Sequence, residues 1–104
     1  MPATNSWTRW QTADTKVVEQ VFRDHGFPRV DAYRYDMGPI RVRILSRRFE
    51  GKGRWQRHDI AEKIIDTLPE NLRCGILFLA LLTPSEAKDS SMNEEFEHPS
   101  PPLV

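Results

Sequence analysis

The chain has 104 residues, 15 of them basic and 15 acidic, and 38% of its residues are hydrophobic, which suits one small domain. Its longest apolar run, residues 76–82, is far shorter than the roughly 20 residues needed to span a bilayer. Cys74 has no second cysteine for a disulfide, and no apolar signal core follows Met1. The sequence therefore predicts no membrane association and a reducing, cytoplasmic setting.

The first segment, residues 1–12, lacks a hydrophobic period, and we expect it to be flexible. Its two tryptophans, Trp7 and Trp10, offer a hydrophobic clip that can dock on the core. A helix is then predicted from Asp14, a suitable N-cap, to Gly26, a suitable C-cap. The apolar residues that mark its buried face are Val17, Val18, Val21 and Phe22.

Two strands follow the helix, at residues 30–36 and 40–45, and the short turn at 37–39 predicts an antiparallel hairpin. Side chains alternate along both strands, so each strand contributes to two faces. The apolar face of the second strand consists of Ile40, Val42 and Ile44. The opposite face of the hairpin is aromatic and basic, with Tyr33, Tyr35, Arg41 and Arg43.

The loop at residues 49–58 leads into a second helix, which is predicted to reach Leu68 and to stop before Pro69. The apolar run at 76–82 predicts a third strand, either covered on both faces or central in the sheet. Strand–helix–strand connections are right-handed, which places the third strand parallel to the second.

These elements give the order α-β-β-α-β in an α+β domain at residues 13–87, with helices on one face of a three-stranded mixed sheet. A capping box of Thr83 and Glu86 adds a short last helix. From residue 88 onward the chain is rich in Ser, Glu and Pro, so we expect residues 88–104 to form a disordered acidic tail.

The loop after the second strand has a residue spacing that resembles the BolA family. It contains the pattern Ser-x-x-Phe-x-Gly, and an Arg-His pair opens the second helix. A Thr-Pro-x-Glu segment after the third strand is also similar. The resemblance covers residues 14–87 and implies a fold like that of a class II KH domain. The matching positions are Ser46, Phe49, Gly51, Arg57, His58, Thr83, Pro84 and Glu86.

The same resemblance implies monothiol glutaredoxins as partners, with which BolA-like proteins share a [2Fe-2S] cluster. The cluster ligands of the family correspond to Gly75 and to the hairpin turn at 37–39, and neither offers a ligand here. Cys74 lies one residue from the first position, and a shift of one residue in a strand reverses the side-chain direction. We therefore expect no cofactor, no metal and no cluster sharing, and glutaredoxin binding is kept only as a hypothesis.

Basic residues are concentrated in residues 23–57, which contain ten Lys or Arg against four acidic residues. This asymmetry is typical either of a solvated surface or of a site for an anionic partner. The glycine-rich loop before the second helix is not a Walker motif, because the Gly-Lys-Ser/Thr ending is missing. The alternative function is nucleic-acid binding through Arg47, Arg48, Lys52, Arg54 and Arg57.

Catalysis is not expected, because His58 has no recognisable constellation around it; Glu62, four residues on, is its one candidate partner on the helix. A histidine at a helix start more often packs on the neighbouring loop.

The aromatic and basic face of the sheet is the stronger candidate site, because Tyr and Arg beside apolar residues are typical of interface anchors. Either a protein partner or second copy binds this face, or Trp7 and Trp10 fold over it. We predict a non-enzymatic, regulatory binding protein whose partner-binding residues are Tyr33, Tyr35, Arg41 and Arg43.

Overall fold

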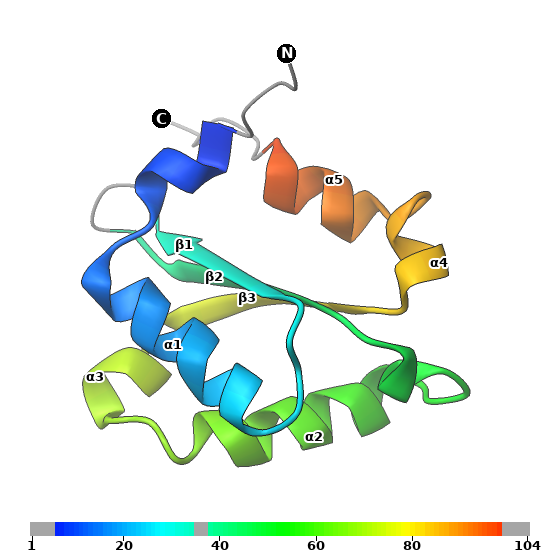
Figure 1. Ribbon diagram of the computed structural model, residues 1–104, viewed down its shortest axis with the longest axis horizontal. Helices are drawn as coiled ribbons and strands as arrows, with labels where there is room; N and C mark the ends of the chain where they lie inside the picture. Colours follow the sequence, from blue (N-terminus) through cyan, green and yellow to red (C-terminus); the bar gives the residue numbers. More distant parts are fainter. Residues whose placement is uncertain (1–5, 35–37, 99–104) are drawn as a thin grey trace.

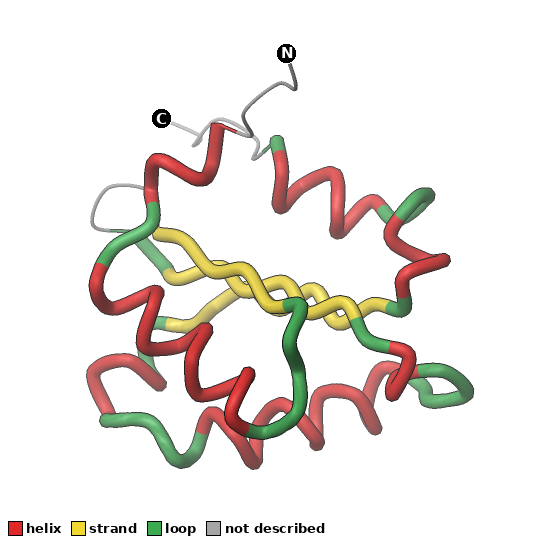
Figure 2. The backbone as a smooth tube through the Cα atoms, in the orientation of Figure 1, coloured by secondary structure: helices red, strands yellow, loops and turns green. Residues whose placement is uncertain are grey.

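A three-stranded sheet lies at the centre of the computed structural model, which describes residues 6–34 and 38–98. Its strands are β1 (Val30–Arg34), β2 (Ile40–Leu45) and β3 (Ile76–Leu82), in the spatial order β1-β2-β3. Helices lie on both sides of this sheet (Figure 1 and Figure 2). The predicted α+β class and three-stranded mixed sheet are confirmed, whereas the prediction of helices on one face only is wrong.

The strand pairing agrees with the sequence analysis. β1 and β2 are antiparallel, with Ala32 opposite Val42, and β2 and β3 are parallel, with Arg43 opposite Ala80. The central strand is β2, so β3 is an edge strand, although its apolar sequence also allowed a central place. Residues 35–37, which were predicted to end the first strand and begin the turn, lie outside the described residues.

Helix α1 (Ala13–Asp24) packs against β1, and its N-cap is Thr12 rather than the predicted Asp14. The Thr12 hydroxyl accepts a hydrogen bond from Thr15 N at 3.2 Å, and Thr12 N donates to Thr15 Oγ1 at 2.8 Å. This reciprocal pair satisfies two amides at the helix start, and Asp14 lies in the first turn, where its charge complements the helix dipole.

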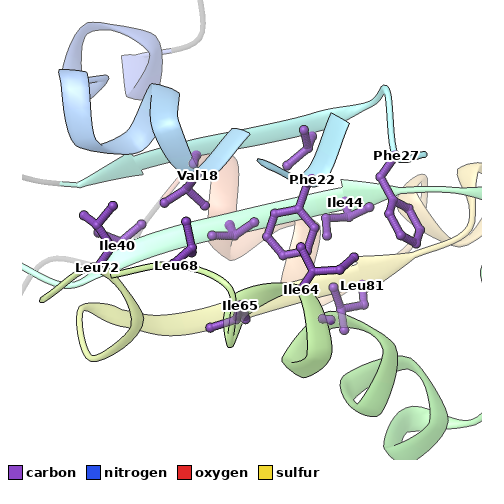
Figure 3. Packing of buried hydrophobic residues seen from close by; sticks show 14 of the residues in the cluster. Val18, Phe22, Phe27, Ile40, Ile44, Ile64, Ile65, Leu68, Leu72 and Leu81 are labelled. Carbon is purple, nitrogen blue, oxygen red and sulfur yellow. The ribbon is translucent and has the colours of Figure 1, made fainter. Parts of the chain in front are cut away.

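The connection from β2 to β3 contains η2 (Arg47–Phe49), α2 (Arg54–Ile65) and α3 (Glu70–Arg73). α2 ends before the predicted Leu68, and Pro69 is the N-cap of α3. α2 and α3 lie on the same face of the sheet as α1 (Figure 1). The main core fills this layer (Figure 3), and its buried members include Val18, Phe22, Phe27, Ile40, Ile44, Ile64, Ile65, Leu68, Leu72 and Leu81.

Segments from both ends of the chain cover the opposite face of the sheet. They are η1 (Ser6–Trp10), α4 (Pro84–Ala87) and α5 (Ser91–Glu97), which Figure 1 shows on the far side of the strands from α1 and α2. Contacts link η1 to β1 and α5 to both β2 and β3. A second, smaller core lies beneath them, formed by Trp7, Tyr33 and Phe96 with Trp10 and Phe78 around it.

This second layer contains parts of both segments that were expected to lie outside the folded domain. Residues 6–10 and 91–97 are helical, although residues 1–12 were expected to be flexible and residues 88–104 disordered. The polar composition misled the prediction, because α5 depends on features that composition does not report. Ser90 caps its first amides, and Phe96 is a fully buried anchor.

Candidate functional site

The predicted partner-binding face of the sheet is closed in the structure. Tyr33 has no exposed surface, and its hydroxyl donates a hydrogen bond to Phe96 O at 2.8 Å. The rings of Trp7 and Phe96 pack on Tyr33 with centroid distances of 5.8 and 4.9 Å. The expectation of an open face at Tyr33 is therefore wrong, and the alternative of a docked N-terminal segment is confirmed for Trp7. Tyr35 lies outside the described residues.

The two arginines of this face hold α5 against the sheet. Arg43 is buried, and its guanidinium pairs with Asp31 and with Glu97 at 2.6 Å each. Arg41 pairs with Glu95 at 3.6 Å. The expectation that both arginines are exposed is therefore wrong, for the same reason as for Tyr33. Their partner is α5 of the same chain, and Glu97 lies 54 residues after Arg43 in the sequence.

The loop that resembles the BolA motif is organised around Arg57. Its Nε donates to Lys52 O at 2.9 Å, and its Nη1 donates to Leu81 O at 2.9 Å. The same guanidinium forms a bidentate ion pair with Glu86, with Nη1–Oε1 and Nη2–Oε2 distances of 2.6 and 3.1 Å. Hydrogen bonds from Arg57 and from Thr83 N lower the pKa of Glu86 from 4.5 to about 2. Arg57 therefore joins the loop, α2, the end of β3 and α4.

The aromatic and glycine positions of the motif are structural as well. Phe49 is fully buried and stacks on Phe27 with the ring centroids 5.5 Å apart, and the Arg57 guanidinium lies over the Phe49 ring, 5.7 Å from its centroid. Gly51 has a φ of 74°, a left-handed conformation that favours glycine. The motif thus shapes the entry to α2.

His58 is half-buried beside this entry, and its side chain forms no hydrogen bond or ion pair with another described residue, although Ser85 and Asp89 line the same groove. The neighbouring Asp59 forms an ion pair with Lys63 at 3.3 Å instead of contacting His58. No hydrogen bond joins His58 to Glu62, the partner that the sequence suggested, among the described contacts. A general acid–base role needs such a partner within hydrogen-bond reach.

The five basic residues proposed for nucleic-acid binding divide into two groups. Arg57 is committed to the contacts above, and Arg48 donates to His25 O at 3.1 Å and stacks over Phe27 at 4.1 Å. Arg47, Lys52 and Arg54 are exposed and form no ion pair with any described residue. The structure therefore leaves three of the five cations available to a ligand.

A groove that the sequence analysis did not anticipate runs beside the free edge of β3. Its volume is about 1090 Å³, and it is bordered by the start of α2 on one side and by α4 and the start of α5 on the other. Trp55 and Leu77, which line it, are 81% and 73% exposed, and Met92 is also exposed. Large apolar side chains gathered at one exposed site are typical of an interaction surface.

The outer edge of β3 offers peptide groups to this groove. Leu82 O accepts a hydrogen bond from Ser46 N at 2.9 Å and so faces the β2 side, whereas Leu81 O faces outward to Arg57. Peptide groups of alternate residues point to opposite edges of a strand, so the peptide N–H and C=O of Leu79 also face outward. No described side chain binds the peptide groups of Leu79.

The outer edge of β1 is blocked by side chains. The buried carboxylate of Glu19 accepts a hydrogen bond from Ala32 N at 2.8 Å, and Gln11 Nε2 donates to Ala32 O at 3.3 Å. Gln11 also donates to Glu19 at 2.8 Å, which locks the two side chains together. Burial raises the pKa of Glu19 above its ordinary value.

The residues at the position of the BolA cluster ligand do not fit a [2Fe-2S] cluster. Gly75 has no side chain to act as a ligand, and a Cβ atom there would already lie 3.3 Å from Ile40 Cδ1 and 3.4 Å from Asn71 O. Cys74 is exposed at the end of α3. Within residues 6–34 and 38–98, no group of three or more His, Cys, Asp or Glu side chains could hold a metal ion.

No protein-family model matches this chain, and it has no significant similarity to a curated protein or to a solved structure. Among the described residues, no helix has the length and hydrophobicity that crossing a membrane requires. The groove is therefore interpreted from its own geometry.

Proposed function

We propose that this protein is a non-enzymatic, regulatory binding protein that associates with a protein partner through the groove beside β3. The observation that carries the proposal is the contrast between an open, apolar β3 edge and a blocked β1 edge. Unpaired strand edges accept further strands, and proteins normally block edges that are not used in this way. The exposed Leu77 and Trp55 supply apolar contacts on either side of such a strand.

The fold supports the further proposal that the chain is a divergent BolA-like protein with class II KH-like architecture. The order α1, β1, β2, α2, β3 and the mixed sheet agree with the αββαβ arrangement that this resemblance implies. Glutaredoxin cluster sharing is not part of the proposed function, because Gly75 has no side chain to ligate a cluster and the described residues hold no group of three or more His, Cys, Asp or Glu that could bind a metal. A cytoplasmic location remains part of the proposal.

Site-specific photo-crosslinking tests the proposed function for a protein partner of any sequence. Benzoylphenylalanine replaces Leu77 in the full chain, and the matched control replaces Val17, an exposed apolar residue of α1 outside the groove. Irradiation of cells that produce the protein should give a discrete crosslinked species from position 77 and none from position 17. If position 77 yields no crosslink, or the same products as position 17, the proposal is wrong.

Nucleic-acid binding is the second candidate, favoured by the exposed cations Arg47, Lys52 and Arg54 around the entry to α2. Three phosphate contacts predict a slope of log K against log salt of roughly −2.7 for duplex DNA. Fluorescence anisotropy with a labelled duplex at several salt concentrations measures this slope. A triple substitution of the three residues by alanine should abolish the binding, and a salt-independent affinity would contradict the candidate.

A further inference from the structure

We infer that the partner of the β3 edge is a second copy of this chain, whose own β3 pairs with it in the antiparallel direction. The inference rests on the proposed function, because it names the occupant of the same groove. A two-fold axis perpendicular to the sheet places two identical strands side by side in opposite directions, so one surface serves both copies. The two sheets then form one continuous sheet, and neither β3 edge remains exposed.

The backbone of β3 fixes the centre of this pairing. The outward peptide group of Leu79 can exchange both hydrogen bonds with Leu79 of the second copy, as residues opposite each other in an antiparallel pair do. This register brings Leu77 toward Leu81 of the second copy. The pairing of β3 with β2 shifts its register at Leu77, and Leu81 O is already bound by Arg57, so the proposed hydrogen bonds are those of Leu79. The end of the groove near Leu81 is also where α2 begins, because Arg57 binds Leu81 O there. Leu77 is thereby covered by the apolar end of the second copy's groove, which Trp55 lines.

The charges of α2 provide an independent argument, because they oppose the dipole of their own helix. The first turn contains Arg54 and Arg57 and no acidic residue, and the C-cap is Asp66; the last turn also contains Lys63, which pairs with Asp59 at 3.3 Å. Acidic groups are favourable at a helix N-terminus and basic groups at a C-terminus. An antiparallel α2 from a second copy removes this conflict, because its acidic end lies beside the basic end of the first.

The side of α2 that faces the groove has charges that match those of an antiparallel second copy. Trp55 and His58 line the groove, and Glu62 and Asp66 continue the same side of the helix at spacings of three and four residues. Both acidic side chains are exposed, and neither forms an ion pair with a described residue. Each copy therefore presents a basic, aromatic end and an acidic end. This pattern fits a second copy better than an acidic peptide, which would match only the basic end.

Sedimentation equilibrium of the full chain tests the inference directly. The protein should form a dimer of twice 12.1 kDa in a reversible, concentration-dependent manner. The Leu79 amide should exchange slowly with solvent in the dimer and rapidly in a Leu77→Lys variant, which should weaken association by at least about tenfold. A Val17→Lys variant should dimerise like the unchanged protein. A monomer at every concentration, or a dimer with an unprotected Leu79 amide, would overturn the inference.

A pair of charge-reversal variants tests the inference even if one of the substitutions lowers the stability of the fold. One variant carries Glu62→Lys and Asp66→Lys, and the other carries Lys52→Glu and Arg54→Glu. Each should be monomeric alone, because like charges then face each other across the two-fold axis. An equimolar mixture should dimerise, since both contacts of the mixed pair are again between opposite charges. No rescue in the mixture would contradict the antiparallel arrangement.

The two proposals fail in different ways. If position 77 crosslinks to a different protein and the chain is monomeric, the binding function stands and the second-copy inference is wrong. If the chain dimerises, but position 77 gives no crosslink and Leu77→Lys leaves the dimer unchanged, both proposals are wrong. A crosslinked species of twice the chain mass that is lost on charge reversal and recovered in the mixture supports both.

Discussion

The two edges of the sheet differ in whether side chains occupy their outward peptide groups. At β1, Glu19 and Gln11 occupy the N–H and C=O of Ala32, so no further strand can pair there. At β3, Arg57 is the only described side chain that binds the outer edge, and it does so at Leu81 near the end of the strand. The chain thus uses a buried carboxylate to block one edge and leaves the other open beside exposed leucine and tryptophan. This difference is the basis of the proposed function, because proteins normally block strand edges that take no partner.

The largest expected effect comes from removing the one side chain that anchors the β3 end. Arg57→Ala breaks charge-assisted hydrogen bonds to Glu86 and leaves Leu81 O and Lys52 O without their donor. We expect a loss of about 3 kcal/mol in the free energy of unfolding. Urea denaturation measures it. Arg57→Lys keeps the charge but cannot form the bidentate pair, so it should recover only part of the lost stability. Full recovery would show that charge alone matters.

Opening the blocked edge should have the next largest effect. Glu19→Ala removes the acceptor of Ala32 N, and the loss of a buried hydrogen-bond partner costs about 2 kcal/mol. Chemical denaturation measures this loss, and light scattering should show increased self-association through the unblocked β1 edge. Glu19→Gln keeps an acceptor and should be closer to the unchanged protein. Equal stability of Glu19→Ala and the unchanged protein would mean that the blocking contact contributes nothing.

Acid should act on the two edges with opposite signs. The pKa of Glu86 is lowered to about 2, so its ion pair stabilises the fold above pH 4.5, and this contribution is lost as the pH falls toward 2. The pKa of Glu19 is raised by burial, so the cost of its charge is relieved as the pH falls through that raised value. Melting temperatures of Glu86→Gln and Glu19→Gln between pH 7 and pH 2 test both signs.

Glu86→Gln should lose less stability in acid than the unchanged protein, because it has no ion pair left to lose. Glu19→Gln should gain less on mild acidification, because it carries no buried charge to neutralise. Parallel curves for both variants and the unchanged protein would show that neither edge depends on these protonation states.

The smallest effect on stability should come from the open edge itself. Leu77 is 73% exposed, so Leu77→Lys should change the free energy of unfolding by no more than about 0.5 kcal/mol, while weakening association by at least about tenfold. Val17→Lys is the matched control on α1 and should alter neither property. Thermal unfolding and sedimentation of the two variants measure both quantities. A large loss of stability in Leu77→Lys would show that Leu77 supports the monomer fold instead of an interface.

The sequence predicted the parts of this fold that depend on local pattern. The alternation of Ile40, Val42 and Ile44 predicted β2 and its buried face, and chain handedness then predicted the parallel β3. It could not predict the order of strands in the sheet, because the apolar run at 76–82 suits an edge as well as a centre. Leu77 was therefore not recognised as exposed, and the groove was missed with it.

The cover on the second face was missed for a related reason. Arg43 alternates with the apolar residues of β2 like any solvent-facing side chain, and its pairing with Glu97 spans 54 residues. Nothing local in the sequence marks such a pair. Trp7 and Trp10 were the available signal, because tryptophans in a polar segment need an apolar site in which to bury their rings.

The hydrogen bond from Tyr33 to Phe96 joins residues 63 positions apart, and this has a consequence for synthesis of the chain on the ribosome. The sheet and the α1–α2 layer need only residues up to β3, whereas the second layer must wait until Phe96 has left the exit tunnel. Until then, Trp7 can cover only part of this face, and the surfaces of Tyr33, Phe78 and Arg43 that α5 covers stay open. The nascent chain thus passes through a stage with an exposed apolar surface on this face of the sheet. Such exposed surface is what chaperones bind and what promotes aggregation.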